Sequence, residues 1–327
     1  MRGRAWLAGC AVLALAACAP APAPAQITTI GQLGAAYVAA GGECTDLVEQ
    51  YRASEEEPVV AACGDATELV LAADADEALG IATQRQLQEQ TVLVHDRWVI
   101  RDPEVQALQQ ALGGEVVTLA PADGPANMAD AIAFDAEGVV PAEPVPAEGE
   151  PAAPPPAEGV HDILVVIDPD CEYCDRALAA SGGALEALAD AGEARVSYLP
   201  VSLGDQIGNG YASTLGANAL ACVADAAPEA YRGFQGALLA HLQEHAFDAD
   251  EVTALAEGRG AEVGDCIGTA RFAWWVRQAT VRAIEQPLQG VEPLRGVPTI
   301  IVDGATFGGD VGDPEALAAF VAEQPVG

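Results

Sequence analysis

Two cysteines separated by two residues, at the junction of a strand and a helix, constrain this chain more than any other feature. Cys171-Glu172-Tyr173-Cys174 follows the apolar run 163–167, which predicts a buried strand. The Ala- and Leu-rich residues 176–188 predict a helix, interrupted at 181–183 by Ser-Gly-Gly. Free N–H groups and the helix dipole at a helix N-terminus favour a thiolate, and a second thiol one turn later can resolve a mixed disulfide. The pattern predicts a redox pair in which Cys171 attacks and Cys174 resolves.

Other chemistries of a C-x-x-C pair fit this sequence less well. A structural zinc site needs two more ligands, but the chain has no second C-x-x-C, and His241 and His245 lie on a distant helical stretch. Haem attachment needs a His after Cys174, where Asp175 stands. A purely structural bond between the two cysteines would close too small a loop to restrict the unfolded chain much. We therefore expect no metal and no cofactor.

The first residues have the pattern of a targeting segment. Arg2 and Arg4 precede the apolar run 5–17, which is too short to span a membrane as a mature helix. Leu15-Ala16-Ala17-Cys18 matches a bacterial lipobox and predicts lipidation of Cys18, although ordinary cleavage before Gln26 is an alternative. Residues 1–25 are thus expected to be signal and spacer. The expected location is the cell envelope or periplasm, with a lipid anchor to a membrane, where disulfides persist.

The remaining cysteines can form structural disulfides. Eight cysteines are present, but Cys10 leaves with the signal and Cys18 is lipidated or lost, so six remain. Nearest-neighbour pairing gives Cys44–Cys63 and Cys222–Cys266 besides the C-x-x-C pair, although six cysteines allow fifteen pairings. The alternative that Cys222–Cys266 is a redox relay stays open.

A Pro-, Ala- and Glu-rich stretch divides the chain. We expect a small α/β domain over 26–135, stapled by its own disulfide, a semi-rigid linker over 136–160, and a second domain over 161–327. The second domain shows a strand at 195–201, a helical insertion over about 205–290, a strand after Val297-Pro298 and a final helix at 316–324.

Charge excludes one class of partner. The formal net charge is −35, and the fourteen cationic side chains are all Arg. Binding to nucleic acid needs clustered cations against the phosphates, so we expect none. The acidity instead predicts a solvated, self-repelling surface.

The second domain resembles the DsbA-like branch of the thioredoxin superfamily. The matching segments are I-D-P-D-C-E-Y-C (167–174), A-C-V-A (221–224), F-Q-G-A-L-L (234–239), D-C-I (265–267) and G-V-P-T-I-I-V-D-G (296–304). The resemblance implies a thioredoxin-like α/β fold with a helical insertion, and thiol–disulfide oxidoreductase activity. It also implies a cis Val297–Pro298 peptide beside the cysteine pair, where substrate backbone docks, with Glu172 and Tyr173 supporting the site. The implied partners are cysteine-containing exported proteins and an unidentified membrane redox partner.

The sequence departs from that family between the cysteines. Strong oxidants of the family carry Pro-His there, whereas Glu172-Tyr173 supplies no cation, and Asp168, Asp170 and Asp175 add negative charge. Negative charge nearby disfavours a thiolate. We therefore predict that Cys171 is less acidic, and the cysteine pair less oxidising, than in the strong oxidants of the family. Two other functions stay open: an isomerase or reductase of the same fold, because DsbC/DsbG-like isomerases also have two domains, and a lipid-anchored binding module with inert disulfides.

Overall fold

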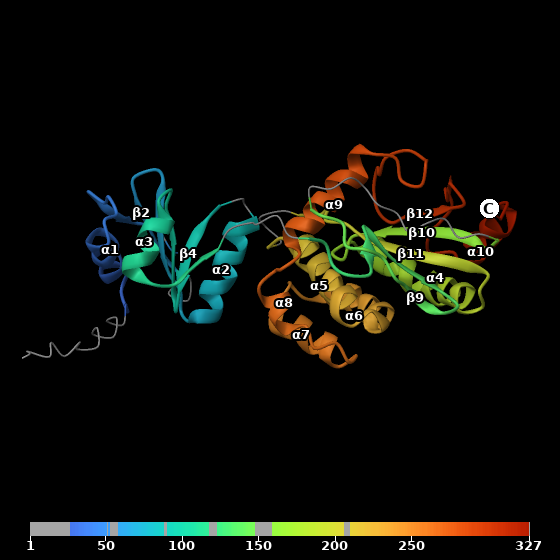
Figure 1. The fold of residues 1–327 in the computed structure, drawn as a ribbon, viewed down its shortest axis with the longest axis horizontal. Helices are drawn as coiled ribbons and strands as arrows, with labels where there is room; N and C mark the ends of the chain where they lie inside the picture. Colours follow the sequence, from blue (N-terminus) through green and yellow to red (C-terminus); the bar gives the residue numbers. More distant parts are fainter. Residues whose placement is uncertain are drawn as a thin grey trace, which may run out of the picture.

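A computed structural model describes residues 27–50, 52, 58–87, 90–117, 123–147, 159–205 and 210–326 (Figure 1). The predicted signal segment with Cys18 lies outside the described residues, as do residues 148–158 of the predicted linker. The described chain forms two sheets, one of six strands and one of seven. No helix in the described part of the chain is long and apolar enough to cross a membrane.

The first sheet is entirely antiparallel and belongs to the N-terminal region. Leu69 and Leu71 face one side, where α1 and α3 pack, and Val70 faces α2 on the other, as the alternation along a strand requires. Its strand order is β1-β2-β3-β5-β4-β6. The elements are α1 (Ile30–Ala39), β1 (Leu47–Glu49), β2 (Val59–Cys63), β3 (Thr67–Leu71), α2 (Ala75–Leu87), β4 (Val92–His95), β5 (Trp98–Arg101), α3 (Val105–Leu112) and β6 (Glu115–Val117).

The second sheet has the strand order β13-β12-β10-β11-β8-β7, with β9 paired to β8. Its central strands are parallel, with Ile163 opposite Val196, and the other pairs are antiparallel. Ile163 and Val165 point to the face covered by α4 and α10, whereas Leu164 and Val166 point to the opposite face. The elements are β7 (Met128–Ala129), β8 (Ala131–Asp135), β9 (Gly138–Val140), β10 (His161–Ile167), α4 (Glu172–Asp190), β11 (Ala194–Pro200), β12 (Thr299–Val302), β13 (Ala305–Thr306) and α10 (Pro314–Glu323).

A helical insertion separates β11 from β12, as the sequence predicted. Figure 1 shows its helices gathered beside the sheet. The insertion is apolar throughout its centre: Leu220, Phe234 and Trp275 are fully buried and join the same core as the sheet. The helices are α5 (Ala212–Ala226), the short 3₁₀ turn η2 (Pro228–Ala230), α6 (Tyr231–Glu244), α7 (Ala249–Glu257), α8 (Gly264–Gly268) and α9 (Ala273–Glu285).

The structure differs from the predicted domain boundary at residues 135–136. Strand β8 pairs with β11, with Phe134 opposite Val196, so residues 128–140 belong to the second sheet and the expected boundary falls within the β8–β9 hairpin. Part of the predicted linker is also packed, because the Trp275 indole N–H donates to the Val145 carbonyl at 2.8 Å. Sequence pattern indicates that a segment is a strand, but it does not say which sheet the strand joins.

Helix α4 is continuous, although Ser-Gly-Gly at 181–183 predicted an interruption. Ala177, Ser181 and Leu185 are buried at a spacing of four residues, so one face of the helix packs without a break across the glycines. Packing of this face outweighs the low helix propensity of two glycines, about 1 kcal/mol each relative to Ala.

Candidate active site

Cys171 occupies the N-cap of α4. Its backbone N–H donates to the Asp168 carbonyl at 3.1 Å, and its own carbonyl accepts the N–H groups of Cys174 and Asp175. The turn is therefore closed by three backbone hydrogen bonds. This closure places the Cys171 sulfur, which is partly exposed, at the positive end of the helix dipole, while Cys174 is fully buried one turn later.

The two thiols have opposite pKa shifts. The pKa of Cys171 falls to about 6, chiefly because the Cys174 thiol donates a hydrogen bond to it, and the backbone N–H groups of Cys174 and Tyr173 act in the same direction. Burial and the negative charge of Asp168 oppose this shift. The pKa of Cys174 is raised, because it is the donor to Cys171 and is buried. The arrangement therefore favours a thiolate at Cys171 and keeps Cys174 protonated.

The peptide bond between Val297 and Pro298 is cis. It lies beside the cysteine pair, since the Cys171 thiol is 3.8 Å from the Val297 carbonyl oxygen and can donate to it. Residues that are about 126 positions apart in the sequence therefore meet at the reactive sulfur. A cis peptide beside the cysteine pair is the geometry that the family resemblance implied for Val297 and Pro298.

Glu172 and Tyr173 both face solvent. The Tyr173 side chain is 61 % exposed, with the Arg176 guanidinium 4.4 Å from its ring centre. Arg176 also pairs with Glu172 at 3.2 Å. Arg176 therefore places a positive charge near the Glu172-Tyr173 dipeptide, one helical turn later. Its guanidinium interacts with Glu172 and with the Tyr173 ring.

Asp168 contributes more to the site than the sequence indicated. In the sequence it is only one of several acidic residues near Cys171. Its side chain is 1 % exposed and accepts the backbone N–H groups of Leu203 at 2.7 Å, Gly204 at 2.8 Å and Asp170 at 3.0 Å. Its own N–H lies 3.4 Å from the Cys174 sulfur. The carboxylate thus connects the C-x-x-C turn to the loop after β11. The only sequence signal is a charged residue directly after a buried strand.

We predict that Asp168→Asn lowers the pKa of Cys171 and destabilises the fold. Removing the charge takes away an interaction that raises this pKa. An amide has one acceptor oxygen in place of two, so a buried N–H loses its partner at a cost of about 1–3 kcal/mol. The pH dependence of alkylation of Cys171 and urea unfolding measure the two effects.

Glu172→Gln is the matched control, because this exposed carboxylate belongs to the same motif and is paired with Arg176. We expect a much smaller change in both measurements. An Asp168→Asn protein with an unchanged alkylation profile would contradict the electrostatic role of Asp168.

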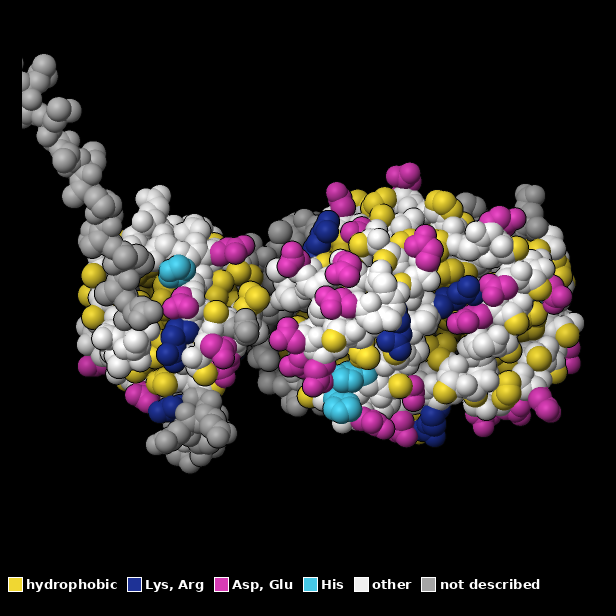
Figure 2. Space-filling view, turned by 90° about the horizontal axis from the view of Figure 1, so that it is seen from below, with side chains coloured by type: hydrophobic (Ala, Val, Ile, Leu, Met, Phe, Trp, Pro, Cys, Tyr) yellow, Lys and Arg dark blue, Asp and Glu magenta, His cyan; other side chains and the backbone are white. Residues whose placement is uncertain are grey.

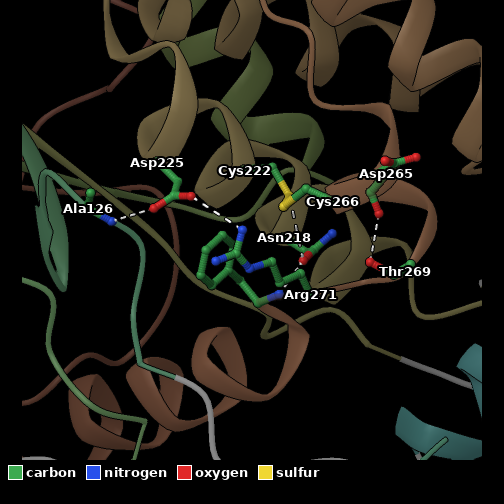
Figure 3. Close-up of a disulfide and its surroundings, with 9 residues drawn as sticks. Ala126, Asn218, Cys222, Asp225, Asp265, Cys266, Thr269 and Arg271 are labelled. Atoms are coloured by element: carbon green, nitrogen blue, oxygen red, sulfur yellow. Dashed lines mark hydrogen bonds and ion pairs between the residues drawn. A yellow bond between two sulfur atoms is a disulfide. The ribbon is translucent and has the colours of Figure 1, made fainter.

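In the described part of the chain, the four cysteines outside the C-x-x-C pair form two disulfides, Cys44–Cys63 and Cys222–Cys266, as nearest-neighbour pairing predicted. Figure 3 shows Cys222 of α5 bonded to Cys266 of α8, with a polar frame around the bond. In that frame Asp225 accepts the Ala126 N–H at 2.8 Å and pairs with Arg271 at 3.6 Å. The disulfide therefore joins two helices of the insertion, and Asp225 beside it links the insertion to the segment before β7.

We predict that replacing both Cys222 and Cys266 with Ala lowers the free energy of unfolding by about 4 kcal/mol. The bond spans 44 residues, and its loss increases the entropy of the unfolded chain accordingly. Thermal or urea unfolding measures this loss. Disulfide exchange at room temperature should be retained, whereas a loss of exchange without a loss of stability would support the redox-relay alternative.

His241 of α6 and His245, which caps the C-terminus of this helix, stack with ring centres 4.6 Å apart. The His241 side chain is only 14 % exposed and lies 3.3 Å from the exposed Glu251. Within the described ranges, no group of three or more His, Cys, Asp or Glu side chains is arranged to hold a metal ion. Acidic side chains are scattered over the face seen in Figure 2, where basic ones are few.

The sequence model of the thioredoxin family matches residues 146–323, which is more than half of the chain. This match confirms the predicted thioredoxin-like α/β fold of the second half. No match is found among the curated proteins.

Several solved structures are similar to the chain. DsbA of Mycobacterium tuberculosis in its oxidised form is 24 % identical, with a TM-score of 0.44 over 52 % of this chain and 87 % of that one. The reduced disulfide bond oxidoreductase DsbG of the same organism is 24 % identical, with a TM-score of 0.44 over 53 % and 85 %. The thiol–disulfide oxidoreductase MdbA of Corynebacterium diphtheriae is 15 % identical, with a TM-score of 0.47 over 62 % and 95 %.

Proposed function

The chain belongs to the thioredoxin family, and we propose that it is a thiol–disulfide oxidoreductase that exchanges disulfides with cysteine-containing exported proteins. One observation carries the proposal. Cys171 lies at the N-terminus of α4, accepts a hydrogen bond from the Cys174 thiol and has a pKa of about 6. A structural cysteine needs none of these features, whereas each of them favours an attacking thiolate.

The exchange runs through a mixed disulfide at Cys171. In the oxidising direction, a substrate thiolate attacks the Cys171 sulfur of the oxidised pair, the bond to Cys174 breaks, and Cys174 leaves as a thiolate that takes up a proton. A second substrate thiolate then attacks the substrate sulfur of the mixed disulfide and releases Cys171 as its thiolate. The substrate loses two electrons and the pair gains them. The reducing direction is the reverse of these steps.

Substrate backbone docks beside Val297 and Pro298 in this proposal. The Val297 carbonyl is 3.8 Å from the Cys171 sulfur, so a peptide held against this segment brings its cysteine to the reactive atom. Tyr173, which lies between the two cysteines in the sequence, adds an exposed aromatic side chain. The position of Val297 beside Cys171 and the exposure of Tyr173 support their proposed roles in substrate docking.

We further propose that the protein is exported to the cell envelope and anchored through lipid on Cys18. The support is the pattern of Arg2, Arg4, the apolar run 5–17 and the lipobox at 15–18. An envelope location also agrees with the two structural disulfides, which persist in oxidising compartments. A membrane redox partner would then reoxidise or reduce the pair. Mass spectrometry of the mature N-terminus tests the lipidation.

Redox titration against glutathione, with thiol trapping to identify the responding cysteines, tests the proposed function. A thiolate pKa of about 6 lies between those of thioredoxin, about 7, and DsbA, about 3.5. We therefore expect a potential between about −270 and −120 mV, carried by Cys171 and Cys174 alone. A potential below about −300 mV without exchange activity would instead support an inert disulfide scaffold.

A further inference from the structure

A hollow of about 660 Å³ lies beside the redox turn. Asp170 is one of its lining residues and directly precedes Cys171, so the hollow begins next to the reactive cysteine. Its volume falls within the range of about 300–1,000 Å³ that is typical of ligand pockets. Val297 and Pro298 do not line it. The hollow is therefore distinct from the docking segment proposed above.

The inner lining of the hollow is apolar and belongs to the helical insertion. Leu215 of α5 and Ile267 of α8 are buried, and Phe247, in the turn between α6 and α7, is partly buried. Leu215 and Phe247 pack in the same small apolar cluster. At Gly268, which ends α8, a side chain would meet only open space. The hollow can therefore take an apolar side chain from a bound segment.

The rim of the hollow carries negative charge. Asp248 and Asp250 are exposed at the N-terminus of α7, where the helix dipole stabilises carboxylates. Asp248 also caps this helix, because it accepts the N–H of Glu251 at 2.9 Å. Asp170 and, from α2, Glu77 bring the carboxylates of the lining to four. None of the described residues that line the hollow is an Arg or a His, so the charge of the lining is negative.

The cation of the redox turn is engaged elsewhere. Arg176 pairs with Glu172 at 3.2 Å and does not line the hollow. The net charge of −35 attracts cations to the whole molecule, but a long-range field does not select one position on its surface. A local preference has to come from the carboxylates around the apolar lining.

We propose that this hollow holds the part of an exported substrate that flanks its reactive cysteine, and that it selects flanks with apolar and cationic side chains. The inference rests on the proposed exchange function and names the substrate class for it. An extended chain advances about 3.3 Å per residue, so residues one or two positions from a cysteine bonded to Cys171 reach the hollow at Asp170. An apolar side chain there contacts Leu215 and Phe247, and a guanidinium or ammonium group meets the carboxylates at the rim. An acidic flank is repelled by the same carboxylates.

Blocked pentapeptides with one cysteine test the charge preference on the oxidised full chain. They are Arg-Leu-Cys-Leu-Arg, Gln-Leu-Cys-Leu-Gln and Glu-Leu-Cys-Leu-Glu. In each reaction two peptide thiols give up two electrons and form a disulfide, while the Cys171–Cys174 pair takes up the electrons. Each rate is divided by the rate of the same peptide with 2-hydroxyethyl disulfide, which removes the effect of the flanking charges on the peptide thiol itself.

We expect the normalised rate of the Arg peptide to exceed that of the Gln peptide by at least about tenfold, and the Glu peptide to be the slowest. The advantage of the Arg peptide should shrink severalfold between about 0.01 M and about 1 M salt, as the Debye length falls from about 30 Å to about 3 Å. Replacing both Leu residues of the Arg peptide with Gly should slow it by about threefold or more, because the apolar contacts are lost.

Two variants with matched controls locate the site. Asp250→Asn should reduce the ratio of Arg to Gln peptide rates by about threefold or more, whereas Glu257→Gln, the same change of charge at the other end of α7, should retain it. Gly268→Leu, which fills the hollow, should slow the Arg peptide by about tenfold, and Gly233→Leu, also in open space, should not. Asp250 is exposed, so its variant decides the location if Gly268→Leu does not fold. Equal falls in Asp250→Asn and Glu257→Gln would assign the preference to overall charge and refute the site.

Oxidation of 2-mercaptoethanol, a small neutral thiol, separates this inference from the proposed function. A protein that exchanges with no thiol would contradict the function itself. Exchange with 2-mercaptoethanol together with equal normalised rates for the Arg, Gln and Glu peptides would overturn the substrate preference alone.

Discussion

Cys171→Ser should lose disulfide exchange by about a thousandfold or more, because a hydroxyl cannot replace the thiolate as nucleophile at neutral pH. The thiol at this position is the partly exposed one and has the lower pKa. Reduction of insulin and oxidation of reduced ribonuclease measure the loss in the two directions. The fold should be retained, since the side chain is only partly buried and forms no structural disulfide.

Cys174→Ser should give a different defect. Cys171 can still attack, but the mixed disulfide has no resolving thiol, so covalent adducts with substrate accumulate. Non-reducing electrophoresis followed by mass spectrometry detects these adducts at Cys171. The Ser hydroxyl can also donate a hydrogen bond to the Cys171 thiolate, so we expect the pKa of Cys171 to stay well below its ordinary value.

The double variant Cys222→Ala, Cys266→Ala is the control for both experiments, because it removes two cysteines that are bonded to each other in the insertion. It should retain exchange. Full activity of Cys171→Ser would show that another cysteine carries the reaction and would overturn the proposed function.

Reactivity of the reduced protein should change near pH 6. Below this pH the thiol of Cys171 is protonated, so the rate of alkylation should fall about tenfold per pH unit, and above it the rate should level off. The redox potential should follow the same ionisation. Its slope should change from about 59 mV per pH unit below pH 6 to about 30 mV above, because reduction then takes up one proton fewer for two electrons.

The ionisation of Cys171 also affects the stability of the reduced form, with a defined sign. The pKa is lower in the folded protein than in the unfolded chain, where it is about 8.5. The stabilisation is therefore complete above about pH 8.5 and is lost as the pH falls through about 6. Unfolding of the reduced protein between pH 5 and pH 9 should show this change, and the oxidised protein, which lacks the thiolate, should not.

Asp168→Asn provides the internal test of these pH profiles. The midpoint of its alkylation profile should lie at lower pH than that of the unaltered protein, because the carboxylate of Asp168 raises the pKa of Cys171. A midpoint of the unaltered protein near pH 3.5 would contradict the prediction of a moderately acidic thiol.

The local features of this protein could be predicted from its residues alone. The apolar run before Cys171 and the helix after it predicted the redox turn, because strand and helix periodicity depends on residues within a few positions. Cysteine spacing predicted both structural disulfides, and the long helical stretch predicted the insertion. The strand and helix signals are carried by neighbouring residues, so the sequence suffices to interpret them, whereas nearest-neighbour pairing was one of fifteen possible pairings and needed the structure to decide it.

Which distant residues meet depends on how the chain packs and could not be predicted from local patterns. The residues of β8 have the pattern of an ordinary apolar strand. Only the pairing of β8 with β11 shows that the strand belongs to the second sheet and not to the first. Asp168 resembles the other acidic residues around the C-x-x-C until the backbone N–H groups of Leu203 and Gly204 are seen to enclose it. Likewise, the hydrogen bond from Gln289 to Asp162 could not be predicted from the sequence around either residue. Burial and hydrogen bonding depend on chain segments packed together from far apart, and they set the charge and reactivity of each group.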